Sequence, residues 1–310
     1  AVTLSGAVGA VSKTVGIATA ATNHNTRHPL VTASYATTMH RLTEGRFCLG
    51  IGRGIGPLFA AYGMSKITTA QMEDFANVMK RLFKGEVIFG HDGPIGKYPI
   101  LALDPTFDEN IPLGITAFGQ NTLELAGRAF DCVILHTFFS DETTQRCVKT
   151  VKDSAERAGR DPDKVRVWSC FATIGDHIPE DIRLKKTVGR LATYLQGYGD
   201  LMVTTNNWDP AVLQRFRDDE FIKTFRGALD GIATTEQLEH VATLIPSEWL
   251  ESAASGTPEQ CVQSIRHQFD LGCDGVIMHG ASPNDLAPIV HEYRATRPVG
   301  VFDHLAANPG

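Results

Sequence analysis

Four closely spaced glycines are the first residues that suggest a ligand. The stretch RLTEGRFCLGIGRGIGP, residues 41–57, has glycine at positions 50, 52, 54 and 56, directly after an apolar segment. A dinucleotide fingerprint needs glycine at its first, third and sixth positions, but the sixth position is Ile55 counted from Gly50 and Pro57 counted from Gly52. The GK[ST] ending of a P-loop is missing from the stretch as well. Two interpretations remain: a mobile turn, or a strand end with no side chains to block a flat ligand.

Another glycine lies where an apolar segment passes into a helical pattern. In ITAFGQNTLELAGRAF, residues 115–130, Gly119 and Gln120 occupy this junction. Free N–H groups at a helix N-terminus bind anions through hydrogen bonds and the helix dipole. The junction therefore predicts either a phosphate-binding turn or a simple turn in which glycine serves the backbone geometry. Arg53, after the glycine-rich strand, could meet an anionic cofactor or substrate, or be a solvated arginine.

Three histidines follow apolar segments of strand length. His24 comes after Asn23 in TAATNHNTRHP, His136 lies in VILHTF, and His279 ends DGVIMHG. In α/β barrels, active-site side chains gather at the carboxyl ends of the strands. We therefore take His24 and His136 as candidate catalytic or substrate-binding groups. The alternatives are a solvated loop residue for His24, and core histidines with satisfied hydrogen bonds for His136 and His279.

The elements that must position these residues alternate along the chain. The predicted strands are residues 15–22, 46–52, 111–118, 131–138, 164–175 and 273–280. Several are apolar on both faces, which is typical of parallel strands covered by helices. The predicted helices begin at Pro29, near residue 68, at Ser140, and within GTPEQCVQSIRHQFDLG and SPNDLAPIVHEYRATRP. This alternation predicts an α/β fold with a parallel sheet.

Two segments interrupt the alternation. Residues 86–110 are rich in glycine and proline and predict an irregular, hairpin-like insertion. Residues 176–256 predict a long, mostly helical insertion with no strand of its own. Insertions of this kind usually lie over the carboxyl end of a barrel, where they shape a substrate pocket.

Composition narrows the classes of protein. The chain has 310 residues, a net charge of −6 and no basic stripe, which argues against nucleic acid as a partner. It has no apolar run long enough for a membrane span, and its first residues lack the charged region of a signal peptide. Six cysteines without a CxxC pair predict buried thiols in a reducing cytoplasm rather than a zinc site. We expect a cytoplasmic protein without metal that acts on a small molecule.

Three stretches, taken in order, resemble the bacterial luciferase-like monooxygenase superfamily. They are RHPL…A…ATTMHRLTEGRFCLGIGRG, ITAFGQNTLELAGRAFD and GTPEQCVQSIRHQFDLGCDGVIM. More narrowly, they resemble its branch of oxidoreductases that depend on the deazaflavin coenzyme F420. The similarity runs through nearly the whole chain. It implies one TIM-barrel domain over residues 1–310, a homodimer, and a flavin or deazaflavin bound at the carboxyl end of the barrel.

The resemblance also implies which residues contact the cofactor. These residues are Ala20, Ala21, Thr22, Arg53, Ala117, Phe118, Gly119 and Gln120. The first three match a strand end where the family forms a bulge behind the ring system, often with a non-proline cis peptide bond. The last four match the phosphate-contacting loop of the family. On this interpretation, the glycines after residue 49 clear space for a flat ring or its ribityl tail.

The sequence departs from the family pattern in two places. The first strand, first helix and second strand of a barrel are not found, so we expect the first βαβ segment to be missing from this chain. About 40–50 further N-terminal residues would supply it, and without them we expect poor solubility or no cofactor binding. In the sugar-phosphate dehydrogenases of the superfamily, Glu and Asn follow the glycines where this chain has Ile55 and Leu58. That difference argues against sugar-phosphate chemistry.

The predicted function is hydride transfer between coenzyme F420 and an unidentified small organic substrate. A deazaflavin has carbon at the reactive position and favours hydride chemistry, while the protein supplies orientation and a dry pocket. Two alternatives stay open: an FMN-dependent luciferase-like monooxygenase, and a non-catalytic or cofactor-free barrel. The cofactor that the purified protein binds distinguishes the three.

Overall fold

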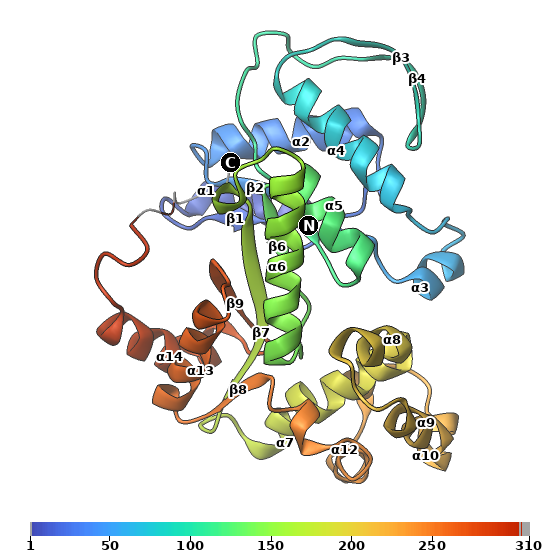
Figure 1. Cartoon of the computed structure of the whole chain (residues 1–310), viewed down its shortest axis with the longest axis vertical. Helices are drawn as coiled ribbons and strands as arrows, with labels where there is room; N and C mark the ends of the chain where they lie inside the picture. Colours follow the sequence, from blue (N-terminus) through green and yellow to red (C-terminus); the bar gives the residue numbers. More distant parts are fainter. Residues whose placement is uncertain (1, 304, 306–310) are drawn as a thin grey trace. The chain divides into compact units, whose positions relative to one another are not determined.

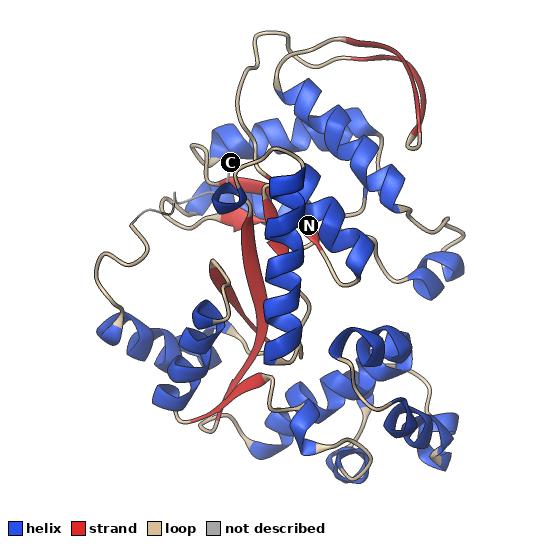
Figure 2. Ribbon diagram, viewed as in Figure 1, coloured by secondary structure: helices blue, strands red, loops and turns tan. Residues whose placement is uncertain are grey.

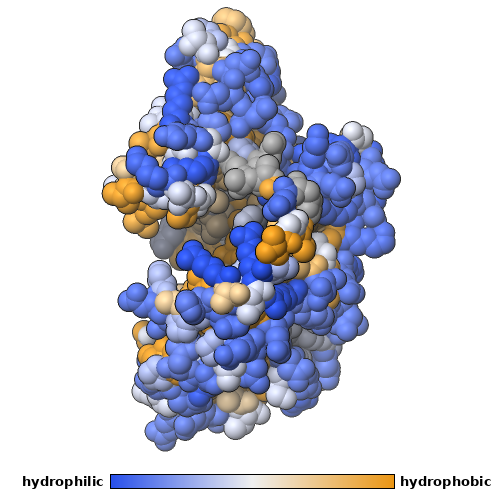
Figure 3. Space-filling model, turned by 90° about the vertical axis from the view of Figure 1, so that its left-hand side faces the viewer, coloured by the Kyte–Doolittle hydropathy of each residue, from blue (hydrophilic) through white to orange (hydrophobic). Residues whose placement is uncertain are grey.

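The computed structural model describes residues 2–303 and 305. The chain forms two compact units, which we describe separately. Unit 1 comprises the described part of residues 1–134, 149–167 and 302–310, and unit 2 comprises residues 135–148 and 168–301. Helices make up most of the regular structure (Figure 2). The face drawn in Figure 3 is mostly hydrophilic, and its apolar side chains form small groups.

Unit 1 is built on four parallel strands. They are β1 (Ile17–Ala18), β2 (Phe47–Ile51), β5 (Leu113–Thr116) and β6 (Cys132–Ile134), paired in this order. β2 is buried along its whole length. Each of these strands lies within a predicted one. β2, β5 and β6 confirm that segments apolar on both faces form buried parallel strands, whereas the two residues of β1 are not buried.

Three helices of unit 1 begin where the sequence predicts. The unit contains α1 (Val2–Val11), α2 (Pro29–Leu42), α3 (Gly56–Ala61), α4 (Thr69–Phe83), α5 (Gln120–Ala129) and the 3₁₀ turns His24–Thr26 and Pro162–Lys164. The three helices are α2, α4 and α5, whereas α3 was not predicted. Pro29 starts α2, where its missing N–H has no cost, and Thr68 and Gln71 form a capping box at α4. α2 packs on β2, and α4 packs on both α2 and α5 (Figure 1).

The segment 86–110 contains the predicted hairpin. β3 (Ile88–Gly93) and β4 (Gly96–Leu101) pair antiparallel as a separate two-stranded sheet. Asp74 of α4 accepts a hydrogen bond from the Ile95 N–H at 3.0 Å, and its Oδ2 lies 3.2 Å from His91 Nε2. These contacts tie the hairpin, drawn as a curved arm in Figure 1, to α4.

Unit 2 contains a strand that the sequence analysis missed. Most of β7 (Arg166–Gly175) lies in this unit and pairs in parallel with β8 (Ala253–Gly256) and with β9 (Gly275–His279). The expectation of six strands, with none in residues 176–256, is therefore wrong, because the described residues form seven parallel strands. β8 has the sequence AASG. It escaped notice because it is short and lacks the β-branched and aromatic residues typical of strands.

The rest of residues 176–256 is mostly helical, as predicted. It forms α7 (Glu180–Leu184), a π-helical turn (Lys185–Gly189), α8 (Arg190–Asn206), α9 (Pro210–Asp218), α10 (Glu220–Thr224), α11 (Leu229–Ile232), α12 (Thr235–Ala242) and a 3₁₀ turn (Ser247–Trp249). α8 is kinked at Tyr198, whose φ of −157° and ψ of 39° are not helical. α6 (Asp141–Arg157) follows β6 in the chain. No helix in the described part of the chain combines the length and the apolar character needed to span a membrane.

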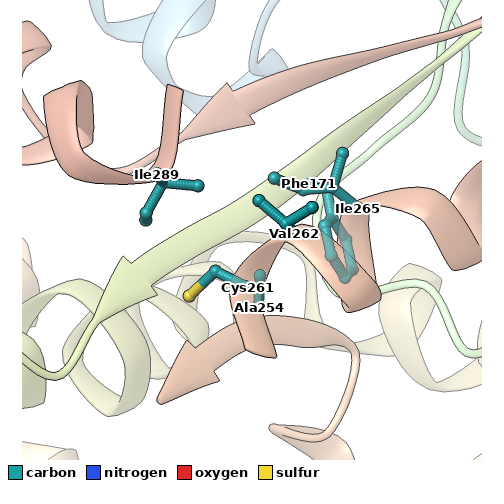
Figure 4. Packing of buried hydrophobic residues seen from close by; sticks show 6 residues of the cluster. All are labelled: Phe171, Ala254, Cys261, Val262, Ile265 and Ile289. Atoms are coloured by element: carbon teal, nitrogen blue, oxygen red, sulfur yellow. The ribbon is translucent and has the colours of Figure 1, made fainter. Parts of the chain in front are cut away.

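A hydrophobic cluster holds the last two helices on β7 and β8 in unit 2. α13 (Pro258–Asp270) begins within the predicted stretch, with a capping box of Thr257 and Gln260, and α14 (Pro283–Thr296) follows β9. The buried cluster is shown in Figure 4 and consists of Phe171, Ala254, Cys261, Val262, Ile265 and Ile289. Cys261 is packed here as a free thiol. All six cysteines are free, five of them buried, as the sequence analysis expected.

Candidate cofactor and active-site residues

The end of the first strand lies against the glycine-rich strand β2. The Thr22 N–H donates to Gly50 O at 3.0 Å, and the Gly52 N–H donates to Thr22 O at 2.9 Å. The peptide bond between Ala20 and Ala21 is cis, which the family resemblance implies. Ala20, Ala21 and Thr22 thus form a short extension of the strand beyond its regular part.

Gly50 in β2 and Gly52 just after it make room for the protein itself. A Cβ atom at position 50 would lie 1.8 Å from Thr19 O, and one at position 52 would lie 2.6 Å from Thr116 Oγ1 and 2.9 Å from Ala21 Cβ. No real Cβ approaches other atoms so closely. The hypothesis that these glycines clear space for a flat ring is therefore wrong at Gly50 and Gly52, because protein atoms already fill that space.

The next two glycines differ from each other. Gly54 has a φ of 71°, and a Cβ there would lie 2.5 Å from the Phe59 ring. A Cβ atom added at Gly56 would have no atom within 4 Å, apart from those of Gly56 itself and its adjoining backbone. Only Gly56 therefore borders open space.

Arg53 lies at the first turn of α5. Its Nη2 donates to Thr122 Oγ1 at 3.0 Å and to Thr69 Oγ1 at 2.7 Å, and its Nη1 lies 3.4 Å from Ile67 O. The side chain is half-buried, and burial lowers the pKa of its guanidinium. Among the described residues, no carboxylate pairs with it. The hydroxyl groups orient the guanidinium but leave its charge uncompensated. Because the side chain is half-buried and held by these contacts, Arg53 is not a solvated arginine.

The start of α5 adds backbone donors. Gly119 is the N-cap of α5 and provides no capping side chain. Thr122 and Leu123 donate their N–H groups to Gly119 O at 3.0 and 3.1 Å, whereas the N–H groups of Gln120 and Asn121 have no acceptor among the described residues and can serve an outside acceptor. Gln120 turns its amide to Glu124 Oε1 at 2.8 Å. The Ala117 N–H is already used by Ile134 O at 3.0 Å. Within this loop, the backbone of Gly119 and Gln120 is therefore better placed to bind an anion than Ala117.

Arg53 and the start of α5 together fit an anionic group. Thr122 holds the uncompensated guanidinium of Arg53 at the start of α5, where the helix has available N–H groups and the positive end of its dipole. The sequence analysis did not single out Thr122. The phosphodiester of a deazaflavin coenzyme and the phosphate of FMN both have the matching chemistry. The signal for Thr122 was present in the sequence, since a hydroxyl residue three positions after the N-cap lies in the first turn.

His24 is a buried residue of unit 1 with one nitrogen unused. Only 7% of its surface is exposed, and its Nε2 has no hydrogen-bond partner among the described residues. Its ring centroid lies 5.7 Å from that of Phe75. Burial lowers the pKa of the imidazole, and the nearby Asp74 carboxylate partly opposes the shift. The alternative of a solvated loop histidine is wrong, and the orphan nitrogen can serve a ligand.

His136 has partners on both ring nitrogens in unit 2. Its Nδ1 lies 2.9 Å from Thr137 O, and its Nε2 lies 3.0 Å from Tyr198 Oη. A carbonyl can only accept, so we assign the proton to Nδ1, and Nε2 accepts from the tyrosine hydroxyl. Burial lowers the pKa of His136 to about 4. The ring is therefore neutral at pH 7.

An aromatic and polar cluster surrounds His136. The Tyr194 ring lies 4.8 Å from the His136 ring and stacks on Tyr198 at 5.5 Å. Thr137 Oγ1 lies 3.6 Å from Cys170 Sγ. The sequence analysis missed both tyrosines, although their spacing of four residues in TYLQGY places them on one helical face.

His279 ends β9 and has a buried Nδ1 without a hydrogen-bond partner among the described residues. Burial lowers its pKa, and the positive charges of Arg190 and Lys186 add to the shift. His279 in turn helps to lower the pKa of His136. The sequence analysis offered a core histidine with satisfied hydrogen bonds as the alternative for both residues. His136 has the satisfied hydrogen bonds, but His279 does not.

A family model described as luciferase-like monooxygenase matches residues 1–295. The chain belongs to the luciferase-like monooxygenase family. It is therefore an oxidoreductase of this family, with the α/β fold that the sequence analysis expected.

Two named relatives are reductases. The chain is 26% identical over 272 residues to a 5,10-methylenetetrahydromethanopterin reductase of Methanolobus tindarius, covering 86% of this chain and 77% of the relative. It is 30% identical over 266 residues to a phthiodiolone/phenolphthiodiolone dimycocerosates ketoreductase of Mycobacterium sp. (strain JLS), covering 81% of this chain and 66% of the relative.

Solved structures share the fold. The F420-dependent tetrahydromethanopterin reductase of Methanopyrus kandleri matches with a TM-score of 0.72 at 18% identity, over 93% of this chain and 84% of that one. The oxygenating constituent of 3,6-diketocamphane monooxygenase of Pseudomonas putida, in complex with FMN, matches with a TM-score of 0.62 at 18% identity, over 93% of this chain and 79% of that one. At these identities the likeness establishes the fold alone.

Proposed function

We propose that this protein is an F420-dependent oxidoreductase that transfers hydride between the deazaflavin and a small organic substrate. The observation that carries the proposal is the uncompensated Arg53 guanidinium, held by Thr122 at the open N-terminus of α5. This site suits the phosphodiester of the coenzyme. The two named relatives support a reductase rather than an oxygenase.

The residues of unit 1 divide into two roles. Arg53, Gly119 and Gln120 would hold the phosphodiester, and Ala20, Ala21 and Thr22 would form the small-residue surface beside the ring. When bound, a deazaflavin supplies a carbon that accepts or gives hydride. His24 would offer its unused Nε2 to the cofactor or the substrate.

An FMN-dependent monooxygenase is the second candidate, because the anion site would accept the phosphate of FMN equally well. The test is a fluorescence titration of the purified protein with coenzyme F420 and with FMN. We expect saturable binding of F420 and reduction of the protein-bound coenzyme by a substrate. Tight binding of FMN with none of F420 would overturn the proposal in favour of the monooxygenase.

Arg53→Ala tests whether the cofactor binds at the proposed anion site. We expect it to weaken F420 binding at least tenfold, because a charge-assisted hydrogen bond contributes about 1.5–3 kcal/mol. Arg157→Ala is the matched control, since it removes the same charge from an exposed position of unit 1. Equal effects of the two substitutions would contradict the assignment of the site.

We further propose a cytoplasmic homodimer that acts on small molecules and not on nucleic acid or membranes. The net charge of −6 supports the exclusion of nucleic acid. Light scattering of the purified protein gives its oligomeric state. The same measurement with added DNA tests whether the protein binds nucleic acid.

A further inference from the structure

We propose that a cavity in unit 2 binds a small organic amine that carries an aromatic ring and an oxygen acceptor. The cavity has a volume of about 950 Å³, which is in the range of pockets that bind small molecules. All the residues that line it belong to unit 2. The inference concerns binding alone and does not depend on the proposed function.

The cavity lies on the face of β7 opposite to His136. Phe171 of β7 lines it, and Phe171 also packs against α13 in the cluster of Figure 4. Successive side chains of a strand point to opposite faces. The preceding residue, Cys170, turns its sulfur to Thr137 Oγ1 at 3.6 Å, beside His136. The cavity is therefore separate from the aromatic cluster around His136.

Carboxylates make up the charged lining of the cavity. The acidic lining residues are Asp141, Glu142, Asp209, Glu248 and Glu251. Asp209 caps α9, and Asp141 and Glu142 lie in the first turn of α6, so the fold accounts for these three. Glu248 and Glu251 cap no helix and have no basic partner among the described residues. No lysine or arginine is among the described residues that line the cavity. This charge favours a cationic ligand.

Two tryptophans give the cavity an aromatic wall. Trp208 and Trp249 both line it, and they stack with ring centroids 4.2 Å apart and an angle of 7° between their planes. Trp249 is buried, whereas Trp208 is partly exposed. Within the part of the chain that the structure describes, Trp208 has no other ring or cation contact. A ligand ring can stack on its second face, and an ammonium group can bind there through a cation–π interaction.

Gln268 is an independent sign of a ligand. It lines the cavity although only 3% of its surface is exposed. Its Oε1 accepts a hydrogen bond from Ser169 Oγ at 2.7 Å, but its Nε2 has no hydrogen-bond partner among the described residues. Buried polar groups are normally hydrogen-bonded. A hydroxyl or carbonyl oxygen of the ligand would supply the acceptor that the Gln268 amide needs.

Asn206 joins two walls of the cavity. This buried residue ends α8, and its Oδ1 accepts from the Ser140 N–H at 3.0 Å, directly before α6. Its Nδ2 donates to Phe138 O at 3.1 Å. Both polar atoms of the amide thus hold the end of α8 to the start of α6. Because these bonds form within the protein, this part of the cavity needs no ligand to set its shape.

Calorimetric titration of the full chain with three related compounds tests the ligand class. Tyramine carries the ammonium group, the ring and a hydroxyl, phenethylamine lacks the hydroxyl, and hydroxyphenylpropionate has the opposite charge. We expect saturable binding of tyramine, with affinity about two- to tenfold lower for phenethylamine because the Gln268 amide stays unpaired. Hydroxyphenylpropionate should show no binding up to about 10 mM. Equal affinities of tyramine and phenethylamine would overturn the role of Gln268.

Variants of the lining residues locate the bound amine. Replacing both exposed carboxylates, Glu248→Gln with Glu251→Gln, should lower the affinity for tyramine about three- to tenfold. Glu236→Gln with Glu239→Gln is the matched control, since it makes the same change of charge at exposed positions of α12 outside the cavity. Trp208→Leu should lower the affinity about fivefold or more, and urea denaturation shows whether this variant is folded.

Three results would overturn the inference. They are no saturable binding of tyramine by the wild type up to about 10 mM, an affinity for hydroxyphenylpropionate equal to that for tyramine, and equal effects of the two double substitutions. None of these measurements uses F420. Failure of this inference is therefore distinguishable from failure of the proposed function, which the titration with F420 tests.

Discussion

Thr122 Oγ1 accepts a hydrogen bond from Arg53 Nη2 at 3.0 Å, which brings the end of the glycine-rich strand to the first turn of α5. The contact joins residues 69 positions apart in the chain. It orients the arginine without neutralising it, because a hydroxyl is an uncharged acceptor. The first prediction concerns this contact.

Thr122→Val keeps the side-chain shape and removes the acceptor. We expect F420 affinity to fall about three- to tenfold, in line with the roughly 0.5–1.5 kcal/mol of one hydrogen bond. Thr38→Val, at an exposed position of α2, is the control. Fluorescence titration measures both, and an unchanged affinity for Thr122→Val would mean that Arg53 needs no such orientation.

Gly119→Asp places a carboxylate at the N-cap of α5. Aspartate caps helices well, and the φ of −99° at this position suits any residue, so the fold should persist. The carboxylate would repel the phosphodiester, and we expect cofactor affinity to fall at least tenfold. Gly119→Asn has nearly the same size without the charge and should lose much less. Affinity of Gly119→Asp within twofold of wild type would reject this anion site.

Gly50→Ala tests the structural role of the glycines in β2. The added methyl would meet Thr19 O at 1.8 Å, and overpacking of this kind costs about 1–3 kcal/mol or more. Gly56→Ala meets no other atoms within 4 Å and should change stability by less than about 0.5 kcal/mol. Urea denaturation measures the two free energies of unfolding. Equal free energies of unfolding for the two variants would show that the strand end shifts to make room for the added methyl group.

The low pKa of His136 predicts a pH-dependent stability. In the unfolded chain its pKa is the ordinary 6.5, and in the folded protein it is about 4. The unfolded state therefore binds more protons in this window, and the free energy of unfolding falls as the pH drops from 6.5 towards 4. The expected loss is up to about 3 kcal/mol. Urea denaturation of wild type and His136→Gln at pH 7 and pH 4.5 should show a smaller drop in the variant, and parallel drops would count against a buried neutral ring.

The sequence by itself determined the features that neighbouring residues encode. Pro29 and the pair Thr257 and Gln260 mark helix starts because capping depends on residues within one turn. The buried strands were recognised because parallel strands covered on both faces need apolar runs. β8 was missed because its small residues carry no such pattern.

Only the tertiary structure decided which distant residues meet. His136 and Tyr198 are 62 positions apart, and no local pattern relates them. Gly50 and Gly52 were assigned to a ligand from the sequence, whereas the structure gives their space to Thr19, Ala21 and Thr116. A glycine shows only that a side chain is missing. What fills the space depends on long-range packing, which is set by the whole core and not by the adjoining residues.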